Sequence, residues 1–146
     1  MVGFRMANTL SEHGSVSRGV TTTSENGALH SIVETHGISA EVVGPEKKYS
    51  GDEFVSMNCW GFTPALFPGL DALFREFLSA AGRDPLKAEF YLPAAVSAMI
   101  ARGEASVRVL PTESTWFGVT YRDDKPRVEA AIRELVQRKL YPQKLF

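Results

Sequence analysis

Two stretches of this chain carry polar residues at positions where a fold could use them for chemistry. The stretch from Ser11 to Gly14 lies between two expected strands, and its small and polar residues either hydrogen-bond a ligand or simply form a turn. Asn58 interrupts a run of mostly apolar and aromatic residues from Phe54 to Phe62. Because a buried amide needs partners, Asn58 bonds either to neighbouring backbone or to a polar ligand. The pattern leaves both alternatives open at both places.

Metal binding and covalent catalysis have little support. Asp123 and Asp124 could bind Mg²⁺, but acidic residues just before Pro126 are more typical of a helix start. His13 and His36 flank an expected hairpin and could lie on one side of it, yet they lack the spacing of two ligands on one helix. The sequence contains no GxGxxG, Walker A, HExxH, CxxC or GxSxG motif. We therefore predict no metal ligand and no catalytic residue in this chain.

The composition is that of an ordinary globular domain. The chain has 146 residues, 44% of them hydrophobic and 23% charged, and its formal net charge is -1. This charge balance gives no electrostatic reason to bind nucleic acid or an anionic membrane. No apolar run approaches the roughly 20 residues that cross a bilayer. The single cysteine, Cys59, is expected in a buried strand, and one free thiol fits the reducing cytoplasm, which is the expected location.

The elements that position these residues alternate between strands and helices. Strands are predicted at 2–6, 15–23, 28–35, 54–62, 105–110 and 114–120, and helices at 66–78, 92–100 and 123–136. Asn26-Gly27 predicts a hairpin between the second and third strands. Simple alternation along the third strand predicts that Leu29 and Ile32 lie on opposite faces of the sheet. Residues 36–51 are expected to form the most mobile loop. We predict a single α/β domain over residues 1–146 with a mixed sheet.

Five segments, in chain order, resemble the sugar-phosphate nucleotidyltransferases, also called NDP-sugar pyrophosphorylases. They are His13–Val16, Asn26–Glu34, Ser56–Phe62, Ala88–Val96 and Trp116–Thr120. In the family the first segment reads Tyr-Gly-Val-Val, and the second is an Asp-Gly hairpin that ends in Val-Glu-Lys-Pro. The third, fourth and fifth segments read, in part, Val-Asn-Ala-Gly, Gly-Glu-Ile-Gln-Leu-Thr-Asp and Trp-x-Asp-x-Gly-Thr. The match is closer to an uncharacterised nucleotidyltransferase branch, which has Asn-Thr-Leu-Ser-Glu-His-Gly and Trp-Phe-Gly-Val-Thr-Tyr almost as they stand here. The resemblance covers nearly the whole chain.

The resemblance implies a Rossmann-like α/β/α fold around a mixed sheet. It also implies a reaction in which a nucleoside triphosphate and a sugar phosphate form a nucleotide sugar and release pyrophosphate, with Mg²⁺ neutralising the phosphates in the full-length family. The family's glycine-rich nucleotide loop and first metal-binding aspartate precede the matched region, and this chain contains neither. We therefore expect the C-terminal half of the fold, with the N-terminal nucleotide-binding half absent and no cofactor bound by this chain alone.

By resemblance, three residues would bind the sugar. Gly14 would approach it through its backbone, Glu34 would bind its hydroxyl groups, and Asn58 would sit in the pocket. The hairpin brings Gly14 and Glu34 toward the same open end of two strands, so we expect all three to meet in one polar cleft. Two positions depart from the family pattern. Thr35 stands where the family has a lysine, and Gly118 stands where it has its second metal aspartate.

Three functions are compatible with these patterns. The chain is the sugar-side half of a nucleotidyltransferase, an inactive fragment of a split gene, or a non-catalytic binding or assembly module. In the first case its partners are a sugar phosphate, a nucleoside triphosphate and a separate N-terminal half, and the chain alone is expected to be inactive. Because the segment from Val2 to Phe4 matches an interior strand of the family, we also expect an exposed apolar edge or face and self-association.

Overall fold

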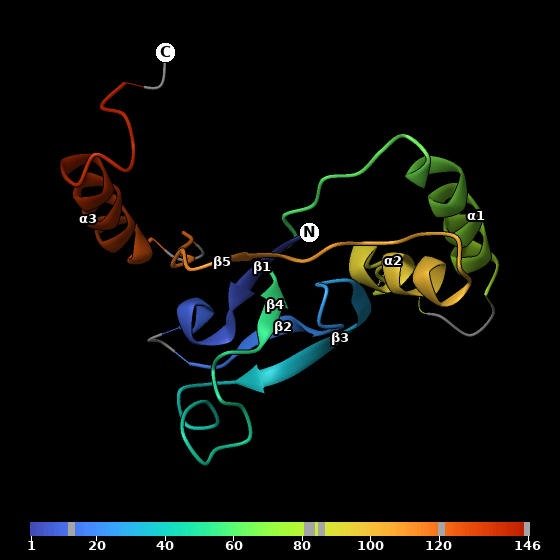
Figure 1. Ribbon diagram of the computed structural model, residues 1–146, viewed down its shortest axis with the longest axis horizontal. Helices are drawn as coiled ribbons and strands as arrows, with labels where there is room; N and C mark the ends of the chain where they lie inside the picture. The colour runs from blue at the N-terminus through green and yellow to red at the C-terminus, as the bar shows by residue number, and fades with distance from the viewer. Residues whose placement is uncertain (12–13, 81–83, 85–86, 120–121, 145–146) are drawn as a thin grey trace. The chain divides into compact units, whose positions relative to one another are not determined.

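The computed structural model describes residues 1–11, 14–80, 84, 87–119 and 122–144, and it divides the chain into two compact units, Met1–Ser114 and Thr115–Phe146 (Figure 1). The first unit contains a five-stranded mixed sheet and the helices α1 and α2, and the second contains the helix α3. The prediction of an α/β chain with a mixed sheet is therefore confirmed.

The sheet has the strand order β3-β2-β4-β1-β5. Its strands are β1 (Val2–Arg5), β2 (Val16–Thr23), β3 (Leu29–Ile38), β4 (Phe54–Ser56) and β5 (Leu110–Thr112). Neighbouring strands are antiparallel except β1 and β5, which are parallel. Because β1 is paired on both sides, Val2 to Phe4 do not themselves form an open edge of the sheet. Self-association through another apolar edge or face stays a prediction.

The hairpin between β2 and β3 forms where Asn26-Gly27 predicted it. The Gly27 amide donates to the Ser24 carbonyl at 2.9 Å, and Gly27 has a φ of +79°, which glycine adopts without strain. The simple alternation expected along β3 is wrong. Thr22 pairs with Ser31 and Thr23 with Leu29, so one residue of β3 bulges out of the ladder. This bulge brings Leu29 onto the same face as Ile32, and both are buried in one core cluster.

Three predicted strands are shorter than expected or missing. The strand predicted at 54–62 ends at Ser56, because Asn58 has a left-handed φ of 56° that turns the backbone out of the pleat. The strand predicted at 105–110 is replaced by β5, which begins at Leu110, and residues 105–109 make only an isolated bridge through Arg108. No strand forms over residues 114–119, and residue 120 lies outside the described residues.

All three predicted helices are present: α1 (Leu66–Ser79), α2 (Leu92–Ala101) and α3 (Asp124–Gln137). The helix α2 packs on β3, and the Ile32 amide donates to Ser97 Oγ at 3.4 Å. On the other side of α2, Val96 and Met99 are buried with Leu66 and Leu73 of α1. Among the helices of the described residues, none is long and apolar enough to cross a membrane.

The opposite face of the sheet is covered by a short 3-10 helix, η1 (Met6–Thr9), and by the loop that follows β3. Met6 is fully buried there with Val43 of the loop and Val55 of β4. The first part of the loop predicted at 36–51 is strand, because β3 continues to Ile38. Its mobility stays a prediction.

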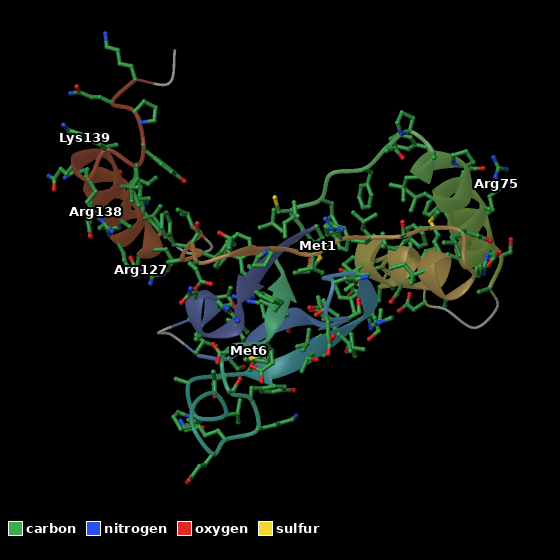
Figure 2. All side chains as sticks on the ribbon, viewed as in Figure 1. Met1, Met6, Arg75, Arg127, Arg138 and Lys139 are labelled. Carbon is green, nitrogen blue, oxygen red and sulfur yellow. The ribbon has the colours of Figure 1, made fainter. Side chains whose placement is uncertain are left out.

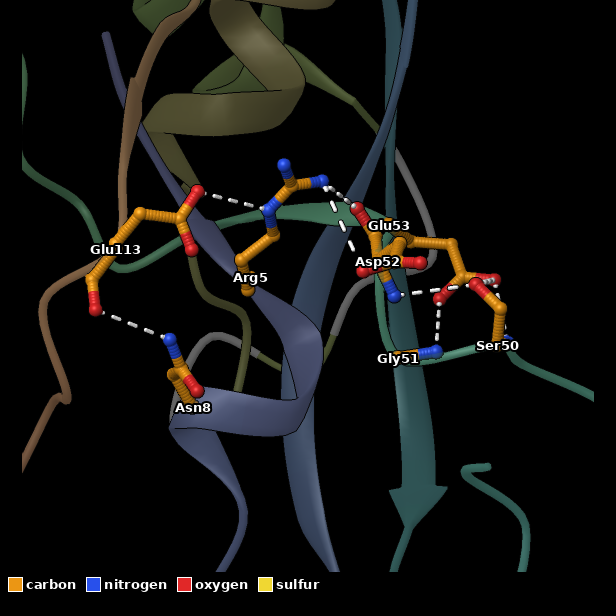
Figure 3. A network of polar contacts seen from close by, with 7 residues as sticks. All are labelled: Arg5, Asn8, Ser50, Gly51, Asp52, Glu53 and Glu113. Carbon is orange, nitrogen blue, oxygen red and sulfur yellow. Dashed lines mark hydrogen bonds and ion pairs between the residues drawn. The ribbon is translucent and has the colours of Figure 1, made fainter. Parts of the chain in front are cut away.

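The end of this loop is tied to the sheet by polar contacts (Figure 3). The Glu53 carboxylate accepts hydrogen bonds from the Ser50 and Gly51 amides, each at 2.8 Å, and from Ser50 Oγ at 3.1 Å. Arg5 of β1 donates to the Asp52 carbonyl at 3.0 Å and to Glu113 at 3.3 Å. Burial acts to raise the pKa of Glu53, but the hydrogen bonds outweigh it and hold that pKa below its usual value.

The second unit is built on α3. The apolar side chains of α3 are at most half-buried, and Ile132 is exposed. Figure 2 labels Arg127, Arg138 and Lys139 along this helix and its end. Before α3, the Trp116 ring packs over Gly118, where an added Cβ would lie 2.8 Å from Trp116 Cη2. A side chain at residue 118 would therefore displace this ring.

The hydrogen bonds to Glu53 predict a pH-dependent contribution to stability. Because the pKa of Glu53 is lower in the folded chain, its contribution is present above the unfolded pKa of about 4.3 and is lost as the pH falls through the folded value. We expect Glu53→Gln to lower the free energy of unfolding at pH 7 by up to about 1 kcal/mol and to have a smaller effect near pH 3. Urea unfolding at both values tests this. Glu41→Gln, at an exposed position of the same loop, is the control, and an equal loss at both pH values for Glu53→Gln would contradict the expectation.

Gly3 in β1 is expected to be intolerant of a side chain. A Cβ there would lie 2.5 Å from Val109 Cγ1 and 3.3 Å from Phe54 Cβ, and Val109 is buried. We expect Gly3→Ala to lower the free energy of unfolding by about 1–3 kcal/mol through overpacking. Gly61→Ala, where a Cβ meets no atom within 4 Å, should change it by less than about 0.5 kcal/mol. Equal urea midpoints for the two variants would show that the close contact relaxes without cost.

Candidate functional site

A glycine in the middle of the sheet creates a gap between two polar side chains. Gly19 of β2 pairs with Glu34 of β3 on one side and with Ser56 of β4 on the other. Directly opposite residues of antiparallel strands place their side chains on the same face. A Cβ on Gly19 would lie 2.9 Å from Ile32 Cδ1 and 3.4 Å from Ser56 Cβ. Ile32 fills part of the space that a side chain on Gly19 would take, and the rest is open between Glu34 and Ser56 on the face that α2 covers.

This space is a polar cavity of about 160 Å³. We call it the polar cavity, and its lining residues are Ser17, Arg18, Gly19, Glu34, Ser56, Met57, Asn58 and Pro93. Pro93 comes from the first turn of α2, and Asn58 comes from the segment that leaves β4. This volume is below the roughly 300–1,000 Å³ of ordinary ligand sites, so the cavity suits a group no larger than one sugar ring rather than a whole nucleotide.

Asn58 holds its place through its backbone as well as its side chain. Its amide N–H donates to Ser56 Oγ at 3.1 Å, and its side-chain Oδ1 accepts from Trp60 Nε1 at 3.5 Å. Asparagine tolerates the left-handed conformation better than other residues with a side chain. Asn58 is exposed rather than buried. Its side chain both bonds to a neighbouring residue and lines the cavity.

Glu34 supplies the carboxylate of the cavity, and its charge acts on the neighbouring Arg18. Burial lowers the pKa of the Arg18 guanidinium, and the nearby Glu34 opposes that shift. Arg18 is mostly buried, also lines the cavity, and donates to the carbonyls of Ser17 and Thr9. At the rim, Ser17 Oγ lies 2.7 Å from His36 Nδ1. The cavity therefore combines one carboxylate and one guanidinium with hydroxyl and amide groups. Such a set can both accept hydrogen bonds from a hydroxyl-rich ligand and donate hydrogen bonds to it.

The structure brings together two of the three residues that the sequence assigned to a sugar pocket. Glu34 and Asn58 line the same polar cavity, whereas Gly14 is not among its lining residues. Gly14 is exposed, has a φ of +140° and bridges to Ser11 in its own turn. Glu12 and His13 lie outside the described residues. Sequence reasoning missed Gly19 and Ser56, although a glycine inside a β-strand pattern is itself a sign of close approach.

The other residues that the sequence singled out lie outside the polar cavity. Cys59 is exposed, which corrects the expectation of a buried strand thiol and follows from the early end of β4. The helix α3 begins at Asp124, but Asp123 makes no capping hydrogen bond through its side chain. Within the described residues, no three His, Cys, Asp or Glu side chains gather as a metal site.

No protein-family model matches this chain, and a search of curated proteins finds no similar sequence. The function is therefore inferred from the polar cavity and from the residue patterns that led to it.

The left-handed backbone of Asn58 gives a test that separates its conformation from its side chain. We expect Asn58→Ala to lower the free energy of unfolding by about 1 kcal/mol more than Asn58→Gly, because glycine adopts a φ of 56° without strain. Both variants remove the amide from the polar cavity. Urea unfolding of the two provides the measurement. Equal destabilisation would mean that the side-chain bond to Trp60, rather than the backbone, accounts for the effect.

Proposed function

We propose that this chain is the sugar-binding part of a protein related to the NDP-sugar pyrophosphorylases, with a Rossmann-like nucleotidyltransferase fold. The observation that carries the proposal is the meeting of Glu34 and Asn58, from separate segments, in one polar cavity. The mixed α/β sheet is compatible with it. In this proposal the Glu34 carboxylate accepts hydrogen bonds from sugar hydroxyls, and Asn58 and Ser56 orient the ring.

In the reaction of this family, an oxygen of the sugar phosphate attacks the α-phosphorus of a nucleoside triphosphate, and pyrophosphate leaves. In this proposal the Mg²⁺ of that reaction is not held by this chain alone, because Gly118 stands where the family has its second metal aspartate and the Trp116 ring packs over it. We therefore assign this chain to sugar binding and derive no catalytic step from it.

Isothermal titration of the chain with a panel of hexoses and hexose 1-phosphates tests the proposal. We expect at least one sugar to bind, and Glu34→Gln to weaken that binding by about tenfold or more, because an amide accepts fewer hydrogen bonds than a carboxylate. Glu25→Gln, on the exposed hairpin turn, is the matched control and should bind as the unmodified chain does.

Two outcomes would overturn the proposal or part of it. If no sugar binds, the chain is a fragment or a module with another ligand. If the chain alone releases pyrophosphate from a nucleoside triphosphate, Mg²⁺ and a sugar 1-phosphate at about 1 per second or faster, it carries the catalytic machinery as well.

A further inference from the structure

A second and larger groove lies next to the polar cavity. It has a volume of about 440 Å³, within the range of ordinary ligand sites, and lies between α1 and the start of α2. Tyr91, the residue that precedes α2, lines this groove, and Pro93, two residues further on, lines the polar cavity. The charge of Glu34 in the cavity also acts on the Tyr91 phenol. The two spaces therefore adjoin at the beginning of α2.

The wall of this groove is aromatic and apolar. Phe77 of α1 and Phe90 lie with their ring centroids 5.4 Å apart in a tilted arrangement, and both line the groove together with Tyr91. The opposite wall is formed by α2, whose short side chains Ala94 and Ala98 leave the groove open. Flat rings pack well in such a space, because aromatic side chains present large, rigid surfaces.

The polar groups around this groove are carboxylates that already have partners. The Arg102 guanidinium donates to both oxygens of Glu76, at 3.2 and 2.8 Å. The Tyr91 hydroxyl is hydrogen-bonded to Glu89, which raises the pKa of Tyr91, and Glu34 adds to that shift. A phosphate in this groove would face the carboxylates of Glu76 and Glu89. The charge distribution therefore favours an uncharged group over an anionic one.

We infer that this aromatic groove is a second subsite, which binds an uncharged aromatic substituent attached to the sugar held by Glu34 and Asn58. The inference rests on the proposed function, because the sugar anchors the ligand beside the groove. The substrate class is then a sugar derivative with an apolar, flat group, and the ring of Tyr91 stands at the junction between its two parts.

Isothermal titration with the methyl and phenyl glycosides of the hexose that binds best tests this inference. We expect the unmodified chain to bind the phenyl glycoside at least about tenfold more tightly than the methyl glycoside. Ala94→Phe should fill the groove from an exposed position of α2 and reduce that ratio to about one, while the methyl glycoside binds as before. Ala101→Phe, at an exposed position of the same helix outside the groove lining, should keep the full ratio.

Each result separates the subsite from the proposed function. If the unmodified chain binds methyl and phenyl glycosides equally well, the subsite is refuted and the sugar cavity stands. If it binds neither, both are refuted. Circular dichroism of the two variants checks that they fold. If Ala94→Phe and Ala101→Phe lose the preference for the phenyl glycoside equally, a general change in α2 rather than filling of the groove causes the loss, and the subsite is refuted. Tyr91→Phe, which keeps the ring, should preserve the preference for the phenyl glycoside.

Discussion

The register of four strands around Ser56 is the constraint on which the rest of this structure depends. Ser56 pairs with Gly3 of β1 and with Gly19 of β2, and Gly19 pairs in turn with Glu34. Because paired antiparallel residues share a face, this row sets one small hydroxyl side chain between two glycines. On the β1 side, Val109 occupies the space above Gly3. On the β2 side, Ile32 packs against Gly19, and the space that remains between Glu34 and Ser56 is part of the polar cavity.

The hairpin between β2 and β3 sets the register in which Gly19 lies opposite Glu34. The turn at Asn26-Gly27 starts the ladder, and the bulge near Leu29 then shifts the alternation by one residue. In a strand, a shift of one residue moves every following side chain to the other face. The bulge thus lets Leu29 enter the core while Glu34 remains on the face that carries Gly19. The same local irregularity serves the packing and the site.

The sequence predicted those parts of the structure that depend on local periodicity. The three helices follow from apolar spacing, and the hairpin follows from Asn-Gly. The end of β4 could not be predicted, because the apolar run continues past Asn58 and only the folded chain selects its left-handed backbone. Family resemblance pointed to Glu34 and Asn58. It did not show that Gly14 lies outside the cavity lining, or that Gly19 is part of it, since both depend on pairing between distant strands.

The three residues of β4 form the ladder between the two halves of the sheet, and the isolated bridge between Ala28 and Arg108 is a second backbone connection between them. β4 joins the hairpin of β2 and β3 to the pair β1 and β5, and Ser56 of β4 also lines the polar cavity. A ligand held between Glu34, Ser56 and Asn58 would bridge this narrow seam and would bind only while the seam is closed. Ligand binding and sheet closure are then linked equilibria, so occupancy of the cavity would slow exchange of the β4 amides with solvent in proportion to ligand concentration.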